Sequence, residues 1–115
     1  MKVIIAGSRT FKNYDLVEQT MSELGLDIDE VVCGGARGAD RLGEEWAKNH
    51  NIPVTYFPAN WNRFGKWAGF KRNEDMAIYA DYLIAFWDKK SRGTKHMIET
   101  MHKYCKHGTV IIYEL

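Results

Sequence analysis

The sequence predicts an α/β fold, a single Rossmann-like domain over residues 1–115 with a five-stranded, mainly parallel sheet in the order 3-2-1-4-5 and helices on both faces. Short apolar runs of strand length alternate with longer segments whose apolar residues recur at helical spacing. Glycine-rich turns follow directly after several of these runs, as they do in βα units. A chain of 115 residues, 45% of them hydrophobic, is long enough to enclose one core.

Five apolar runs are expected to form the strands. Each is short, rich in β-branched or aromatic residues and bounded by glycine, proline or polar residues, as buried parallel strands are. The expected strands are Lys2–Ala6, Glu30–Cys33, Pro53–Phe57, Tyr82–Trp87 and Thr109–Tyr113.

Four helices are expected between these strands. The first has an apolar face that includes Val17 and Met21, begins at Asn13 or Asp15 and ends at Gly25. The second and third are expected at residues 39–50 and 71–80. The last helix carries the clearest apolar stripe and is expected to end at Gly108. This stripe consists of Met97, Ile98, Met101, Tyr104 and Cys105. Residues 58–70 fit neither the strand pattern nor the helix pattern.

Composition and residue spacing argue against several classes of function. The formal net charge of +1 gives no overall electrostatic attraction to nucleic acid. No apolar run approaches the roughly 20 residues that a membrane-spanning helix needs. Cys33 and Cys105 have no metal-ligand spacing, nor do the histidines, so no metal site is predicted. We expect both thiols to be buried and reduced, in a cytoplasmic protein.

Three loops should meet where strands 1 and 4 diverge, which is where open parallel sheets bind their ligands. They span residues 7–10, 34–40 and 88–94. Glycine allows a ligand close to the backbone, hydroxyl and arginine side chains suit a phosphate, and helix N-termini attract anions. The candidate ligand-binding residues in these loops are Gly7, Ser8, Arg9, Gly34, Gly35, Ala36, Arg37, Gly38, Asp40, Asp88, Ser91, Arg92, Gly93 and Thr94.

Residues 60–73, which we call the aromatic–basic segment, alternate aromatic and cationic side chains and contain no acid. Such alternation suits stacked bases and phosphates. The segment has four interpretations: a ligand contact, a lid over the pocket, an oligomer interface, or a loop pinned to the core by its aromatic rings. Its candidate ligand-binding residues are Arg63, Lys66, Arg72 and Asn73.

The motifs GSR at residues 7–9, GGARGAD at 34–40, KRNEDMA at 71–77 and SRGT at 91–94 together resemble the SLOG superfamily. That superfamily includes the DNA-processing protein DprA/Smf, the LOG-type phosphoribohydrolases and small stand-alone domains. The resemblance covers essentially the whole chain and is greatest to the stand-alone members. It implies a Rossmann-like fold that binds a nucleotide or a nucleotide-derived ligand, and it implies a homodimer or higher homo-oligomer.

Two departures from the superfamily's motifs bear on catalysis. His96 and Met97 stand where LOG enzymes carry a glutamate, and Glu74 stands in place of the second arginine of the R-N-R element of DprA. The sequence therefore favours binding, for sensing or sequestration, over turnover. Two alternatives stay open. One is a phosphoribohydrolase-type N-glycosidase or nucleotide hydrolase, which cleaves an N-glycosidic or phosphate bond with Asp88 or Glu99 as its catalytic carboxylate. The other is a single-stranded nucleic-acid binder related to DprA.

Overall fold

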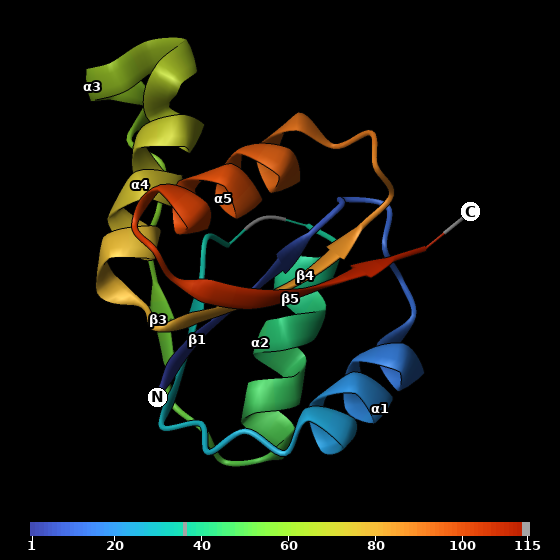
Figure 1. Cartoon of the computed structure of the whole chain (residues 1–115). Helices are drawn as coiled ribbons and strands as arrows, with labels where there is room; N and C mark the ends of the chain where they lie inside the picture. Colours follow the sequence, from blue (N-terminus) through green and yellow to red (C-terminus); the bar gives the residue numbers. More distant parts are fainter. Residues whose placement is uncertain (36, 114–115) are drawn as a thin grey trace.

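The computed structural model describes residues 1–35 and 37–113 (Figure 1). Its five strands form one sheet in the order β3-β2-β1-β4-β5. Every neighbouring pair is parallel, which confirms the predicted fold class and strand order. The strands are β1 (Lys2–Gly7), β2 (Glu30–Cys33), β3 (Val54–Tyr56), β4 (Tyr82–Trp87) and β5 (His107–Ile112).

Helices cover both faces of the sheet, with α1 and α2 on one side and α4 and α5 on the other (Figure 1). This layering follows from right-handed crossovers between parallel strands. The short α3 lies at the end of α4 that is farthest from the sheet (Figure 1). The helices are α1 (Tyr14–Leu24), α2 (Ala39–Asn49), α3 (Trp61–Phe64), a 3₁₀ turn (Gly65–Trp67), α4 (Ala68–Tyr79) and α5 (Arg92–Lys103).

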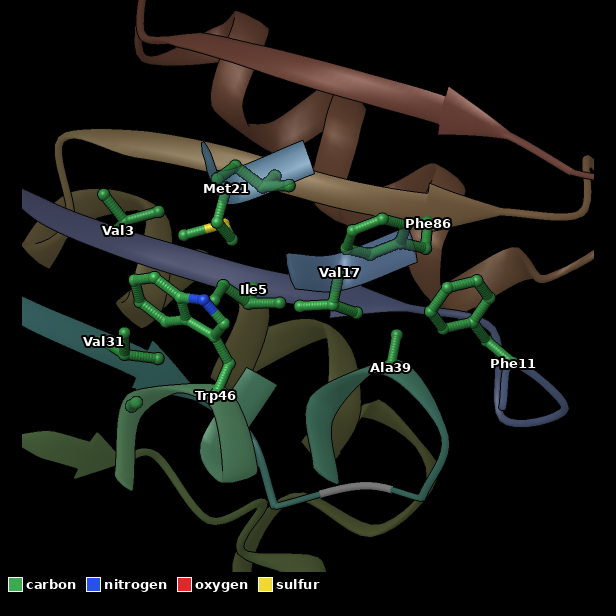
Figure 2. Close-up of a cluster of buried hydrophobic side chains, with 11 residues drawn as sticks. Val3, Ile5, Phe11, Val17, Met21, Val31, Ala39, Trp46 and Phe86 are labelled. Carbon is green, nitrogen blue, oxygen red and sulfur yellow. The ribbon is translucent and has the colours of Figure 1, made fainter. Parts of the chain in front are cut away.

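Alternation along β1 divides the core into two layers. Val3 and Ile5 point toward α1 and α2, where Trp46 packs over them (Figure 2). Ile4 points to the opposite face, into a cluster covered by α4 and α5. Because both faces of the sheet are buried, its central strands are apolar without interruption, as parallel strands usually are.

Three boundaries differ from the sequence prediction by more than one residue. The helix expected from Lys71 begins earlier, at Ala68, directly after the 3₁₀ turn. The helix expected to reach Gly108 ends at Lys103, since Cys105 takes a left-handed φ of 55°. Cys105 is consequently exposed, so the expectation of two buried thiols was wrong for this one, while Cys33 is buried. With the helix ended, β5 starts at His107 and not at 109.

No helix among the described residues is long and apolar enough to cross a membrane.

Gly43 lets α2 lie directly on β1, and this contact yields a stability prediction. A Cβ at Gly43 would lie 2.6 Å from Cβ of Ile5, whereas one at Gly69 of α4 would meet only Trp61, at 3.8 Å. Alanine favours a helix by about 1 kcal/mol over glycine. We expect Gly69→Ala to stabilise the protein by up to about that amount, and Gly43→Ala to destabilise it by about 1–3 kcal/mol through overpacking. Urea unfolding of both variants measures the difference; equal effects would contradict the packing argument.

Candidate functional site

A pocket of about 450 Å³ opens at the carboxyl ends of β1 and β4, the two strands where the direction of sheet winding reverses. This is the place that the topology predicts for a ligand. The first and third predicted loops line it together with one face of α4 and α5. The lining residues are Ala6, Gly7, Ser8, Arg9, Thr10, Asp40, Arg72, Asn73, Met76, Asp88, Lys90, Ser91, Arg92, Gly93, Thr94 and Met97.

Ser8 joins three segments beneath this pocket, and it is only 1% exposed. Its N–H donates to the carbonyl oxygen of Phe86 at 3.0 Å, which ties it to β4. Its carbonyl oxygen accepts from the N–H of Ala39 at 3.3 Å, at the start of α2. Its Oγ accepts from the N–H of Asp88 at 3.1 Å. The hydroxyl expected to face a ligand therefore also fixes the floor of the site.

Glycine at two positions allows these loops to approach so closely. A Cβ at Gly7 would lie 2.2 Å from the carbonyl oxygen of Phe86. A Cβ at Gly38 would lie 2.3 Å from the carbonyl oxygen of Ser8, and Gly38 has a positive φ of 74°. A side chain at either position would push the loops apart. The glycines thus serve loop packing, whatever contact they also make with a ligand.

The third loop is a polar turn that leads into α5. Oδ1 of Asp88 accepts from the N–H groups of Lys90 at 2.8 Å and Ser91 at 2.9 Å. Ser91 is the N-cap of α5: its Oγ accepts from the N–H of Thr94 at 3.3 Å, and the two hydroxyl oxygens lie 2.9 Å apart. The first turn of α5 contains no acidic residue. Its N–H groups and its dipole therefore present partial positive charge to the pocket.

Asp88 is held in its charged form. The hydrogen bonds from the backbone N–H groups of Ser91 and Lys90 lower its pKa, and Ser8 acts in the same direction. A carboxylate with a lowered pKa is ionised at neutral pH and is a weak base. It suits a hydrogen-bond acceptor for a ligand hydroxyl better than it suits general acid catalysis, which needs a raised pKa.

Arg72 and Asn73 form the wall on α4. Nη1 of Arg72 donates to the carbonyl oxygen of Gly34 at 2.8 Å, and its Nε donates to Oδ1 of Asn73 at 3.2 Å. A Cβ at Gly34 would lie 2.3 Å from Nη1, so this glycine makes room for the guanidinium group. Asn73 is 8% exposed, and its Nδ2 donates to the carbonyl oxygen of Gly93 at 3.2 Å. This wall thereby fixes the second loop and the start of α5 relative to each other.

His96 supports the same wall from α5, although the sequence showed only that it lacks metal-ligand spacing and stands where LOG enzymes carry a glutamate. Its Nδ1 lies 3.2 Å from Nδ2 of Asn73, and its ring stacks on Phe70 with centroids 4.2 Å apart. Burial lowers its pKa, while Glu99 and Glu74 act in the opposite direction. A neutral imidazole in this position can accept the hydrogen bond from Asn73. The sequence set His96 apart only by its place in the LOG motif, and its contacts could not be predicted because its partners come from another helix.

The pocket carries more positive than negative charge. Its cationic side chains are Arg9, Arg72, Lys90 and Arg92, and its carboxylates are Asp40 and Asp88. Asp40 lies in the first turn of α2, where the sequence predicted it, and it lines the pocket although it is only 6% exposed.

Several predicted ligand residues do not line the pocket. Gly34, Gly35, Arg37 and Gly38 lie in the second loop, and of the described residues in this loop only Asp40 reaches the lining. Ala36 lies outside the described residues. Arg63 and Lys66 lie on α3 and the 3₁₀ turn, and the candidate carboxylate Glu99 is exposed on α5. The other predicted ligand residues that the structure describes line one cavity. The sequence did not nominate Ala6, Thr10, Met76, Lys90 and Met97 as ligand residues, although Thr10 and Lys90 fell inside predicted loops.

A family match accompanies this geometry. Residues 1–64 match the sequence profile of the YspA, cpYpsA-related SLOG family. The chain belongs to this family. The Gene 61 protein of Mycobacterium phage D29 is 36% identical over 114 residues, covering 89% of each chain.

The SLOG fold is also recognisable in a solved structure. DNA processing protein A (DprA) from Streptococcus pneumoniae superposes with a TM-score of 0.80 over 99% of this chain, at 16% sequence identity. The present chain spans about half of that DprA chain, 51%. At this identity the likeness supports the fold. The family match and the structural likeness together confirm the resemblance to the SLOG superfamily that the sequence indicated.

The environment of His96 predicts a pH dependence of stability. The pKa of His96 is lowered in the folded protein from its ordinary value of 6.5. At a pH between the folded and the unfolded pKa, the unfolded chain therefore binds more protons than the folded protein. The contribution of His96 to the free energy of unfolding is therefore present above the unfolded pKa and is lost as the pH falls through the folded pKa. We expect His96→Gln to lose less stability than the wild type between about pH 7.5 and about pH 5. Urea unfolding at both pH values provides the measurement, and parallel pH profiles would contradict the assignment.

Proposed function

We propose that residues 1–115 act as one unit that binds a nucleotide or a nucleotide-derived ligand in the pocket between β1 and β4. The observation that carries the proposal is the meeting of the acid-free first turn of α5 with the cations that line the pocket. Membership of a SLOG family and the likeness to a DNA-processing protein support a ligand of this class.

The phosphate is proposed to lie at the N-terminus of α5, between Arg9 and Arg92. The backbone N–H groups of Arg92 and Gly93 in the first helical turn lack intrahelical acceptors, whereas that of Thr94 is bonded to Oγ of Ser91; Arg92 and Gly93 both line the pocket. Arg9 has an exposed side chain and no hydrogen bond in the described residues, so it can turn toward a phosphate with little structural cost. Arginine also offers a paired donor geometry that matches phosphate oxygens.

The sugar is proposed to lie toward Asp88 and Asp40. A purely anionic ligand would be repelled by two carboxylates, whereas a ribose offers hydroxyl donors that carboxylate oxygens accept. The pocket's mixture of cations and acids thus matches a ligand with a phosphate and a hydroxylated sugar. Met76 and Met97 supply the apolar surface beside them.

Calorimetric titration with AMP, ADP-ribose and inorganic phosphate tests this placement. Arg9→Ala removes a charged hydrogen-bond donor, and we expect it to weaken nucleotide binding by about 10- to 150-fold, equivalent to about 1.5–3 kcal/mol. Arg37→Ala is the matched control, since Arg37 is exposed and does not line the pocket. The reverse pattern, with loss only in Arg37→Ala, would move the phosphate to the second loop. No binding of any nucleotide would contradict the proposal.

The hydrolase alternative finds less support. Asp88 has a lowered pKa and Glu99 does not line the pocket, so neither is well suited to donate a proton to a leaving base. Chromatography of the same protein–nucleotide mixtures for released base distinguishes the two functions.

One observation favours single-stranded nucleic acid as a second candidate ligand. Trp61 and Trp67 are 58% and 60% exposed, and Phe70 is 38% exposed. Lys66 lies over the ring of Trp67 at 5.6 Å, in a segment without acids. Exposed aromatic rings with interleaved cations are typical of surfaces that stack bases.

Fluorescence anisotropy with a labelled oligothymidylate examines this candidate. If bases stack here, Trp67→Ala should weaken binding by about 1–3 kcal/mol, or roughly 5- to 150-fold, and raised salt should weaken it further. Ile78→Ala removes a comparably exposed apolar residue at the other end of α4, outside the aromatic–basic segment, and should leave binding unchanged. Equal loss in both variants, or no binding at low salt, would count against this candidate.

A further inference from the structure

The two edges of the sheet are built differently. At one edge, β3 has only three residues, with Pro53 before it and Pro58 shortly after. Short edge strands and prolines prevent pairing with another chain. At the other edge, β5 has six residues, HGTVII, with no proline and no Asp, Glu, Lys or Arg. The described structure thus protects one edge against pairing and leaves the other open.

The backbone of β5 has unpaired groups on its outer side. The N–H of Tyr113 donates to the carbonyl oxygen of Trp87 at 3.2 Å, so the backbone groups of Tyr113 face β4. Peptide groups alternate in direction along a strand. Those of Gly108, Val110 and Ile112 therefore point away from β4, where the sheet has no further strand.

The side chains of Val110 and Ile112 are also accessible to a pairing strand. Val110 and Ile112 are 38% and 52% exposed, whereas Ile111 packs against the core on the other face. The lysine nearest to β5, Lys106, does not block pairing at this edge, because its side chain is bound elsewhere. Its Nζ donates to the carbonyl oxygens of Ala77 at 2.6 Å and Ile78 at 2.8 Å, at the end of α4.

We propose that β5 pairs antiparallel with β5 of a second copy of this chain, so that the two sheets become one continuous sheet. Only residues with outward-facing groups on both strands can exchange N–H···O bonds in both directions. A two-fold axis at Val110 satisfies this condition. It places Val110 opposite Val110 of the second copy, and Gly108 opposite Ile112 of the second copy.

The composition of β5 indicates that the strand pairing with it belongs to a second copy of this chain. A two-fold interface must be self-complementary, and an uncharged β-branched strand is, because it juxtaposes no like charges. The small Gly108 makes room for Ile112 of the second copy, which gives these exposed side chains an apolar neighbour. The antiparallel arrangement directs the two pockets toward opposite ends of the joined sheet, so pairing does not obstruct ligand entry.

Sedimentation velocity over low to high micromolar concentrations tests the proposal. The wild type should pass from 13.3 kDa to about twice that mass. Val110→Lys places two like charges opposite each other across the axis and should weaken association by at least about tenfold. Ile78→Lys is the matched control: it introduces the same charge at an exposed apolar residue of α4, 56% exposed, and should leave association unchanged.

Amide hydrogen exchange followed by NMR provides a readout that needs no variant. The N–H groups of Gly108, Val110 and Ile112 should gain protection as concentration rises, while that of Ile111, already bonded to β4, should not change. A monomer at every concentration would overturn the proposal, and so would a dimer lost in Ile78→Lys but kept in Val110→Lys. Protection of the outer amides only after another protein is added would likewise replace the second copy with a foreign strand.

Discussion

The hydrogen bonds of Ser8 are the constraint on which the site depends. One buried residue at the end of β1 bonds to β4, to the start of α2 and to the turn at Asp88. These segments are far apart in the sequence, and each has its own strand or helix to stabilise it. Ser8 fixes their relative positions at the point where the sheet changes winding direction, so the pocket exists before any ligand arrives. Its close neighbours have to be glycine because the loops meet backbone to backbone.

The same constraint limits what the site can do chemically. The polar groups nearest its floor already have partners: the Oγ of Ser8 accepts from Asp88, and Asp88 accepts from two N–H groups. A serine nucleophile needs an adjacent base, and the carboxylate beside Ser8 is that of Asp88, whose lowered pKa makes it a weak base. Preorganised, largely satisfied groups favour recognition over proton transfer. This agrees with the absence from the sequence of the glutamate expected in LOG enzymes.

The fold and the general position of the site could be predicted because both depend on local patterns. Apolar runs of strand length, glycine after β1 and β2, and the alternation with helices determine a parallel sheet, and the sheet determines where loops converge. What could not be predicted depends on contacts between distant helices. His96 gains a role only because Asn73 and Phe70 of α4 pack against it. Cys105 is exposed because the helix ends before it, and no proline or glycine in the sequence marks that point.

The second loop shows how a motif's sequence can suggest one role while its structure supplies another. GGARGAD has the composition of an anion-binding turn, yet its glycines are largely explained by neighbours within the protein. Gly34 makes room for the guanidinium of Arg72, and Gly38 makes room for the backbone at Ser8. The loop therefore contributes to the pocket mainly by positioning Arg72, which carries charge to the wall, and by starting α2 at Asp40. A chain with a net charge of only +1 can in this way keep a cationic pocket, since close packing gathers its charges locally.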